Sequence, residues 1–459
     1  MTAVLAPRQD TPPPVPFGAA LRFWLKLGFI SFGGPAGQIA IMHRELVEQK
    51  RWISERRFLH ALNYCMMLPG PEAQQVATYI GWLLHRTWGG VVAGTLFVLP
   101  SLFLLIGLSW VYVRFGEVSW VAGLFYGIKP AVSAIVLQAV WRIGRRTLRH
   151  PRRVPVLWAI ALLSFAGIAV LKIPFPWIVL AAALAGVAGG RLVPQQFDAR
   201  GTHGSGAAAP AARLRETFVI DDDTPTPAHA RFTKARLARI ALVGAVLWLA
   251  PMALLVAAQG WNGELTRMAW FFTKAALLTF GGAYAVLPYV YQGAVQEFRW
   301  LTGPQMIDGL ALGETTPGPL IMVVTFVAFV GGWSRQVLGP DLLFTGAALA
   351  AVLVTWFTFL PSFLFILAGG PLVESTHGNL KFTAPLTAIT AAVVGVIASL
   401  ALFFLAHIAA RPDGAGIDWI ALAIAAAAAA ALLRYQAGVI AVIAGCALAG
   451  LALRLAGWA

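Results

Sequence analysis

The chain has 459 residues, of which 59% are hydrophobic and only 12% are charged. A soluble globular domain carries about 25% charged residues, so this composition excludes one and indicates a membrane protein with several spans. The net charge is +15, but the arginines fall in short stretches between apolar segments, which favours a role in membrane topology over nucleic-acid binding.

The chain begins with a proline-rich tail, residues 1–16, that lacks the basic and apolar regions of a secretory signal. An apolar segment, 17–42, follows the tail, and Gly33, Gly34 and Pro35 interrupt it. Because glycine and proline break helices, the interruption predicts two short helices in place of one span. An ordinary span with a kink is the alternative.

The next apolar block, 58–85, contains a similar interruption, the Pro-Gly-Pro run 69–71. The stretch 43–57, which precedes this block, contains five Lys or Arg. After the block come two further apolar blocks and then the stretch 141–153, which has six arginines and no acid. Short Lys/Arg-rich loops stay in the cytoplasm, so both stretches should lie on one side of the membrane. They do so if the block enters and returns without crossing, as a re-entrant hairpin of two half-helices.

The second part of the chain repeats the first. At an offset of 248 residues the matching pairs are FWLKLGFISFGG (23–34) with FFTKAALLTFGG (271–282), Trp52 with Trp300, and LPGP (68–71) with TPGP (316–319). Further along, the offset becomes 261 and the pairs are LPS (99–101) with LPS (360–362), Pro151 with Pro412, and Trp158 with Trp419. Two copies of one fold therefore make up most of the chain.

These observations predict an all-α polytopic membrane protein with two homologous repeats and broken, re-entrant helices. We expect an N-terminal tail (1–16), a first transmembrane repeat (17–190), a cytoplasmic linker (191–237), a connecting transmembrane helix (238–258) and a second transmembrane repeat (259–459). The linker, which includes Asp221, Asp222 and Asp223, is too polar to form a core, so we expect it to be flexible.

The two repeats are expected to have opposite orientations in the membrane. The loops of the second copy that match the basic stretches, 291–305 and 402–414, carry one Arg each. One extra helix between the copies would invert the second, which is the inverted-repeat design of many secondary transporters. About nine crossings result, with a cytoplasmic N-terminus and a periplasmic C-terminus.

The interruptions suggest a binding site for an anion. Irregular backbone at membrane depth is tolerated only inside protein or against a water-filled cavity, and a helix that begins there presents unpaired N–H groups and a positive dipole end. Such ends bind anions. We expect four interruptions to meet near the midplane and bind substrate through Gly33, Gly34, Pro35, Pro69, Gly70, Pro71, Gly281, Gly282, Pro317, Gly318 and Pro319.

Charged residues near the interruptions are the other candidates. Lys26 and Lys274 each precede a glycine pair by seven residues, and a lysine at membrane depth costs about 2.5–3.5 kcal/mol, so substrate binding is one explanation and snorkelling to the membrane surface the other. Glu72 and Glu314 flank the Pro-Gly-Pro runs. A carboxylate there repels an anion unless it is protonated, so either could carry a coupling proton; a structural carboxylate is the alternative.

The motifs FGGPAGQIAIMHRELVEQKRW, LPGPEAQQVATYIGW, FGGAYAVLPYV and TPGP resemble the chromate ion transporter family in its long two-domain form. The resemblance covers nearly the whole chain except the tail and the linker. It implies chromate efflux across the bacterial inner membrane, driven by an ion gradient as in an antiporter, and chromate resistance. It also implies a role for the glycines and prolines of the four interruptions.

The sequence departs from many relatives at two points. They place a histidine soon after Gly-Gly-Pro where this chain has Gly37 and Gln38, and the second copy lacks the proline after its glycines. The expected partners are an inorganic oxyanion, chromate or sulfate, and the lipid bilayer, with a homodimer left open and no nucleic acid. Cys65 and Cys446 show no metal-ligand spacing, and no cofactor is expected. A passive anion channel remains an alternative, whereas no motif favours an enzyme.

Overall fold

The computed structural model describes residues 13–32, 34–116, 118–197, 217–222, 224, 227–376, 383–410 and 416–457. Gly33, Asp223 and Pro412 lie outside these ranges, as do most of the tail and much of the linker. Within the described ranges the chain is helical, and β-type pairing is limited to two isolated bridges. The prediction of an all-α fold is confirmed.

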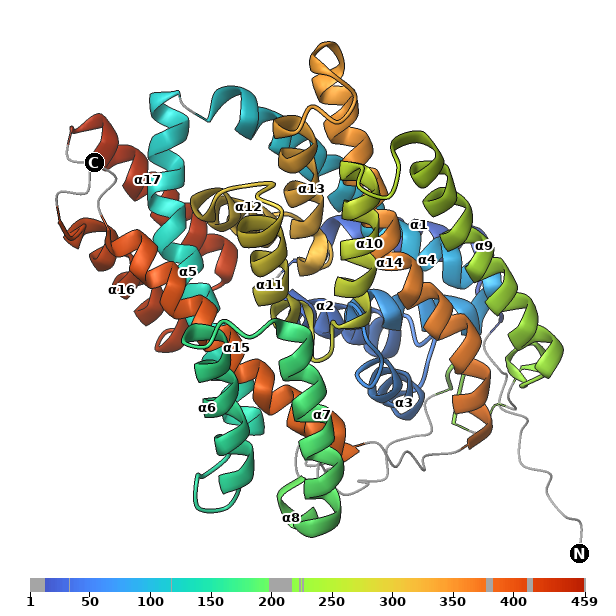
Figure 1. Cartoon of the computed structure of the whole chain (residues 1–459). Helices are drawn as coiled ribbons and strands as arrows, with labels where there is room; N and C mark the ends of the chain where they lie inside the picture. Colours follow the sequence, from blue (N-terminus) through green and yellow to red (C-terminus); the bar gives the residue numbers. More distant parts are fainter. Residues whose placement is uncertain are drawn as a thin grey trace, which may run out of the picture.

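The first half forms short helices around its two interruptions and longer ones after them (Figure 1). These elements are α1 (Phe17–Ile30), α2 (Gly34–His43), the π-helical η1 (Arg44–Gln49), α3 (Glu55–Cys65), α4 (Glu72–Phe115), α5 (Ser119–Thr147), α6 (Pro155–Ala169), α7 (Phe175–Leu192) and the short α8 (Pro194–Phe197). Proline opens α6 and follows the first residue of α7, where its missing N–H is not needed.

After the 3-10 turn η3 (Ala228–Ala230), the connecting helix α9 (Lys234–Gln259) leads into a second half with the same order of elements. They are α10 (Glu264–Leu277), α11 (Ala283–Tyr291), the π-helical η4 (Gln292–Glu297), α12 (Gly303–Thr315), η5 (Leu320–Met322), α13 (Val323–Ser334), η6 (Pro340–Leu342), α14 (Leu343–Thr376), α15 (Thr383–Ala409), α16 (Trp419–Leu433) and α17 (Val439–Leu455).

The register between the halves agrees with the predicted offset at first and departs from it later. The six-residue π-helices begin at 44 and 292, so they lie 248 residues apart. However, α6 and α16 begin at 155 and 419, and α7 and α17 at 175 and 439, so these pairs lie 264 residues apart. The alignment of Trp158 with Trp419 at offset 261 is therefore wrong by three residues, because the second half is longer before α16.

The first interrupted segment of each half doubles back on itself. Near the open end of the α1–α2 hairpin the rings of Phe23 and Trp52 lie 5.3 Å apart, and the equivalent rings of Phe271 and Trp300 lie 5.7 Å apart. Aromatic pairs at this distance in edge-to-face geometry stabilise the contact. Two short antiparallel helices thus replace one span at both positions.

The second interrupted segment also returns to the side on which it began. After Glu72 the helix α4 runs only to His85 and Arg86, where the backbone leaves helical geometry and the chain reverses. Gly81 and Gly89 pack so closely there that a β-carbon on Gly81 would lie 2.5 Å from the Gly89 carbonyl oxygen. The second part of α4 continues from Arg86 to Phe115.

Contacts with the linker locate both ends of this hairpin. Ser54, at the start of α3, donates its backbone N–H to the Ile220 carbonyl at 2.9 Å. At the other end the Trp82 carbonyl and a ring nitrogen of His229 lie 3.0 Å apart. Ile220 and His229 are nine residues apart in the linker, so the start of α3 and the end of the first part of α4 both contact the same stretch of the chain.

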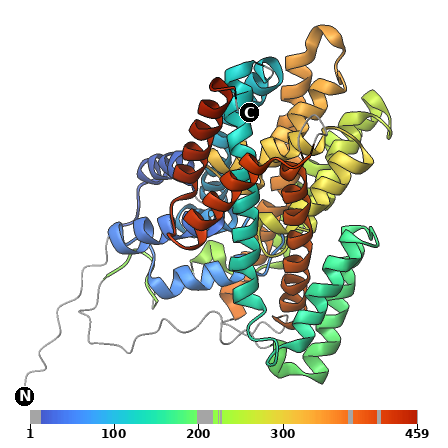
Figure 2. The ribbon, with the colours of Figure 1, turned by 90° about the vertical axis from the view of Figure 1, so that its left-hand side faces the viewer.

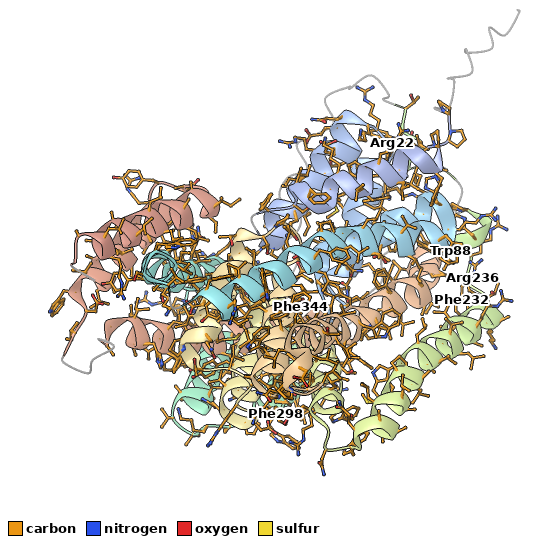
Figure 3. All side chains as sticks on the ribbon, turned by 90° about the horizontal axis from the view of Figure 1, so that it is seen from above. Arg22, Trp88, Phe232, Arg236, Phe298 and Phe344 are labelled. Atoms are coloured by element: carbon orange, nitrogen blue, oxygen red, sulfur yellow. The ribbon has the colours of Figure 1, made fainter. Side chains whose placement is uncertain are left out.

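Among the described residues, six helices are long and apolar enough to cross a membrane. They are the segments Glu72–Phe115, Ser119–Thr147, Phe175–Leu192, Lys234–Gln259, Pro340–Glu374 and Ala384–Ala409. Within α9 only 11% of the apolar window is buried, and Figure 3 shows this helix at the edge of the molecule, packed against α10 and α14. Such an apolar and exposed helix requires lipid around it. The prediction of a polytopic membrane protein is confirmed.

The two halves form one body around α5. This helix runs lengthwise through the middle of the molecule and packs against α15, α16 and α17 of the second half (Figure 2). Close approach is possible because glycines meet: a β-carbon on Gly127 of α5 would lie 1.8 Å from the Cys446 carbonyl of α17. Small residues of this kind are the usual means of helix packing in membranes.

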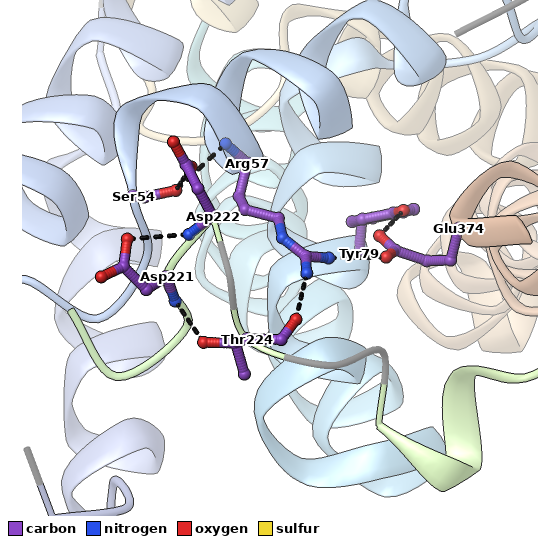
Figure 4. A network of polar contacts seen from close by, with 7 residues as sticks. All are labelled: Ser54, Arg57, Tyr79, Asp221, Asp222, Thr224 and Glu374. Atoms are coloured by element: carbon purple, nitrogen blue, oxygen red, sulfur yellow. Dashed lines mark hydrogen bonds and ion pairs between the residues drawn. The ribbon is translucent and has the colours of Figure 1, made fainter. Parts of the chain in front are cut away.

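Part of the linker, expected to be flexible, is docked onto the first half (Figure 4). Ile220 is only 6% exposed, and its backbone N–H donates to the Trp52 carbonyl at 3.1 Å. Asp222 accepts a hydrogen bond from the Ser54 hydroxyl at 2.6 Å, and Arg57 donates to the Thr224 carbonyl at 2.6 Å. The polar composition of the linker hid this contact, which depends on a few apolar residues, Phe218, Ile220 and Ala230, and on backbone pairing.

Candidate functional site

The interruptions share a backbone conformation that favours glycine. Gly34, Gly70, Gly282 and Gly318 have φ angles of 71°, 126°, 94° and 109°. A residue with a β-carbon rarely adopts such angles, so the glycines allow a helix to end and a new one to begin at once. The helices α2, α4, α11 and η5 begin at or just after these glycines, and each starts at or next to a buried residue.

The interruptions of the two halves meet through reciprocal hydrogen bonds. The backbone N–H of Gly70 donates to the Thr279 carbonyl at 2.8 Å, and that of Gly318 donates to the Ser31 carbonyl at 2.8 Å. Gly318 is the 248-residue equivalent of Gly70, and Thr279 that of Ser31. Two contacts that exchange roles in this way are the signature of a two-fold relationship between the halves.

A second reciprocal contact surrounds the same two glycines. A β-carbon on Gly70 would lie 2.3 Å from the Ser362 hydroxyl oxygen, and one on Gly318 would lie 2.7 Å from the β-carbon of Ser101. These serines belong to the two LPS motifs, which the sequence comparison had paired. The long helices α4 and α14 thus press on the interruption of the opposite half and leave no room for a side chain.

The helices that begin at the site have uncapped ends. No described side chain caps the N-terminus of α4, α11 or η5. An uncapped N-terminus keeps free N–H groups and the positive end of the helix dipole, equivalent to about half a charge. Several such ends in one place favour a negatively charged ligand.

Two carboxylates lie at the first turn of α11. A β-carbon on Gly282 would lie 3.9 Å from the Glu72 oxygen Oε1, so Glu72 faces the start of this helix. Glu314, only 6% exposed, accepts a short hydrogen bond from the Tyr284 hydroxyl. A carboxylate facing a helix N-terminus is stabilised there, and it stands where an anionic ligand would bind.

Buried amide groups complete the polar surroundings. Gln38 is 1% exposed and donates to the Gly318 carbonyl at 2.6 Å, and Gln75 donates to the Pro69 carbonyl at 2.8 Å. The side-chain oxygens of Gln38, Gln74 and Gln75 have no hydrogen-bond partner in the described chain. Buried polar atoms are normally hydrogen-bonded, so the site suits a polar occupant.

The two lysines singled out by the sequence do not reach the interruptions. Lys26, whose side chain is 58% exposed, forms an ion pair with Glu45 at 3.2 Å, and Lys274 lies over the Trp270 ring at 5.8 Å. Neither has a hydrogen bond or ion pair to the interruptions among the described residues. Sequence spacing alone missed Glu45, because the hairpin brings it beside Lys26.

Positive charge reaches the site from another helix. Arg142 interacts electrostatically with Glu314, and Arg146 with Glu72. Both arginines lie on α5, four residues apart and hence on one face of the helix. The sequence analysis had explained these arginines by membrane topology alone. Their four-residue spacing was the signal in the sequence that both lie on one face of a helix.

A helical membrane protein whose broken helices meet inside it with uncapped N-termini has an architecture found among membrane transporters. The sequence pattern described as Chromate transporter matches residues 19–187 and 266–451, that is, once in each half. The chain therefore belongs to the chromate transporter family, as its motifs had predicted. Membership indicates a transporter rather than an enzyme.

Known relatives share most of the chain. It is 35% identical over 396 residues to the chromate transport protein of Pseudomonas aeruginosa, covering 85% of this chain and 82% of that protein. It is 30% identical over 383 residues to the chromate transport protein of Cupriavidus metallidurans, covering 82% and 80%. It is also 30% identical over 115 residues to the uncharacterized transporter YwrA of Bacillus subtilis, covering 25% and 65%. No solved structure matches the chain.

Proposed function

We propose that the protein is a secondary active transporter that exports chromate across the bacterial inner membrane and so gives chromate resistance, with sulfate as a competing substrate. The two relatives above are named chromate transport proteins, and chromate and sulfate are both tetrahedral dianions. The observation that carries the proposal is the reciprocal contact of Gly70 and Gly318, which gathers the uncapped helix ends around one point.

The proposed orientation has the N-terminus in the cytoplasm, the C-terminus in the periplasm and the two repeats inverted. The Arg-rich end of α5 and the helix α3, which follows the other basic stretch, both lie toward the bottom of Figure 1. The equivalent α12 lies in the upper half of the same view. Short basic loops favour the cytoplasm, so the bottom of Figure 1 is the cytoplasmic side in this proposal.

Glu72 is the proposed coupling group. Its carboxylate faces Gly282 at the start of α11, in the position that the helix end offers to substrate. Two negative groups cannot both be accommodated there without strong repulsion, so the dianion binds when Glu72 carries a proton. Proton and anion then cross the membrane in the same direction, so a proton gradient drives chromate out of the cell when the cytoplasmic side is the more acidic one. The buried Glu314 is the second candidate.

Transport into inside-out membrane vesicles tests this function. We expect labelled chromate to accumulate when the medium outside the vesicles is made more acidic than the lumen, unlabelled sulfate to compete, and Gly34→Leu protein that inserts normally to show no flux. Gly34 has a φ of 71°, so leucine is strained there although the space is open. Flux that only follows the chromate gradient would indicate a passive channel, and unchanged flux in the variant would contradict the site.

A further inference from the structure

A large open cavity lies away from the interruptions, between the ends of α4, α5, α12 and α13. Its volume is about 800 Å³, and the charged or polar residues that line it include Arg114, Lys129, Gln305 and Asp308. The ends of α4, α5 and α13 that form it lie toward the top of Figure 1. In the proposed orientation this is the periplasmic mouth of the protein.

The floor of the cavity holds a buried acid beside a partly exposed lysine. Asp308 is 3% exposed, its Oδ2 accepts a hydrogen bond from the Tyr112 hydroxyl at 2.8 Å, and the Lys129 ammonium lies 3.5 Å from the same oxygen. The Lys129 side chain is 32% exposed. A ligand in the cavity can therefore reach Lys129, whereas Asp308 lies beneath it.

Neither member of this ion pair has its hydrogen-bonding capacity filled. The other carboxylate oxygen of Asp308, Oδ1, is buried and has no partner in the described chain. The Lys129 ammonium has three donors, and its one ion pair among the described residues is longer than a good charged hydrogen bond. The cavity thus contains a reachable cation with free donors, and Arg114 adds a second positive charge to its lining.

The opposite mouth contains a similar ion pair, but its members are largely buried and bonded to neighbouring groups. There the buried Glu374 accepts from Tyr79 at 2.6 Å and from Arg57 at 2.8 Å, and Arg57 is also bonded to the docked linker (Figure 4). The Arg57 side chain is only 15% exposed. A tyrosine, an acid and a base thus recur at both mouths, and Lys129 borders the open cavity described above, whereas Arg57 is largely covered.

We propose that this cavity is a second, outer binding site for a tetrahedral oxyanion, in which Lys129 holds the anion and Asp308 competes for the same ammonium group. The identity of the anion rests on the proposed function. Hydrogen bonds from the free donors of Lys129 favour binding of an anion, whereas repulsion from the Asp308 carboxylate opposes it. Protonation of Asp308 removes the repulsion and therefore strengthens binding. The other titratable groups nearby are Tyr112 of α4 and His407 of α15, which Lys129 influences electrostatically.

Equilibrium dialysis of the purified full-length chain in detergent with radiolabelled sulfate tests the proposal. We expect wild-type protein to bind a second equivalent that Lys129→Gln lacks, with an affinity loss of at least about tenfold at that site. Lys129→Arg should restore much of the binding, and the exposed Lys234→Gln serves as the matched control. Asp308→Asn should bind the second equivalent more tightly and without dependence on pH.

The central site must be separated from the outer one. Gly282→Leu should remove one equivalent and leave the one that depends on Lys129. If Lys129→Gln and Lys129→Arg both keep the two equivalents, or wild-type protein binds only the equivalent that Gly282→Leu removes, the outer site does not exist. If the equivalent that depends on Lys129 is the only one bound, the outer site stands and the central site of the proposed function fails.

Discussion

The two halves of the molecule use the same backbone with different side chains. Both halves break their helices at glycines with positive φ, and the breaks contact each other through equivalent atoms. Yet Glu72 of the first half corresponds to Leu320 of the second, and Gln38 corresponds to Val286. The shared feature is the set of uncapped helix ends, whereas neither acid near them is repeated, because Glu314 of the second half corresponds to Met66 of the first.

This difference assigns anion binding and proton coupling to different residues. A backbone site shared by both halves can bind an anion equally from either side of the membrane, because the two halves approach it in the same way. A proton-binding group supplied by one half alone can make the two directions unequal. We therefore expect changes to shared residues to abolish transport, and changes to unshared residues to alter coupling or stability.

The largest effect is expected at the shared glycines. Gly70→Ala and Gly318→Ala should each lower chromate flux at least about tenfold. An alanine held at positive φ costs about 1–2 kcal/mol, and crowding of its β-carbon against neighbouring atoms costs about 1–3 kcal/mol. A β-carbon on Gly70 would meet the Ser362 hydroxyl at 2.3 Å, so Ser362→Gly should restore part of the flux of Gly70→Ala. Gly445→Ala, with open space around it, is the control, and unequal losses at Gly70 and Gly318 would contradict the shared role.

Arg57 tests an ion pair between the two halves that the equivalent residue of the second half, Gln305, cannot form. Arg57→Met should destabilise the protein by about 3–5 kcal/mol, because it leaves the buried Glu374 without its cation. Unfolding in mixed micelles measures this loss. Arg57→Met combined with Glu374→Met should recover most of it, whereas Gln305→Met at the equivalent position of α12 should cost much less. A double variant as unstable as the single one would refute the ion pair.

Glu72 tests the unshared acid at the site. Glu72→Gln should reduce accumulation driven by a proton gradient about tenfold, within the usual range of coupling energies, while exchange of chromate across the membrane persists and loses its pH dependence. Flux in vesicles with and without the gradient measures both quantities. Glu314→Gln is the comparison variant, and gradient-driven accumulation that survives in both variants would exclude this pair of acids as coupling groups.

The smallest effects are expected for the two lysines. Lys26→Ala and Lys274→Ala should each change flux by less than about twofold and stability by less than about 1 kcal/mol. An exposed ion pair such as Lys26–Glu45 contributes little, and Lys274 lies over a tryptophan ring away from the interruptions. A large loss of chromate binding in either variant would show that the lysine takes part in substrate binding.

The sequence predicted the interruptions and their pairing because glycine and proline act locally. Gly70 and Gly318 could be found from their motifs, and the repeat placed them in equivalent positions. The partners of single charged residues could not be predicted, because Glu45 beside Lys26 and Asp308 beside Lys129 depend on hairpins and long-range packing that leave no periodic pattern. The docking of Ile220 was missed for the same reason.

An experimental structure of the chromate-bound protein, with the metal located by its anomalous scattering, tests the central claim most directly. We expect a chromium peak among the N-termini of α2, α4, α11 and η5, close to Gly70, Gly282 and Gly318. A peak at Lys129 in addition would agree with an outer site. Chromium found only away from the four interruptions, with the four helix ends facing apolar side chains, would contradict the account.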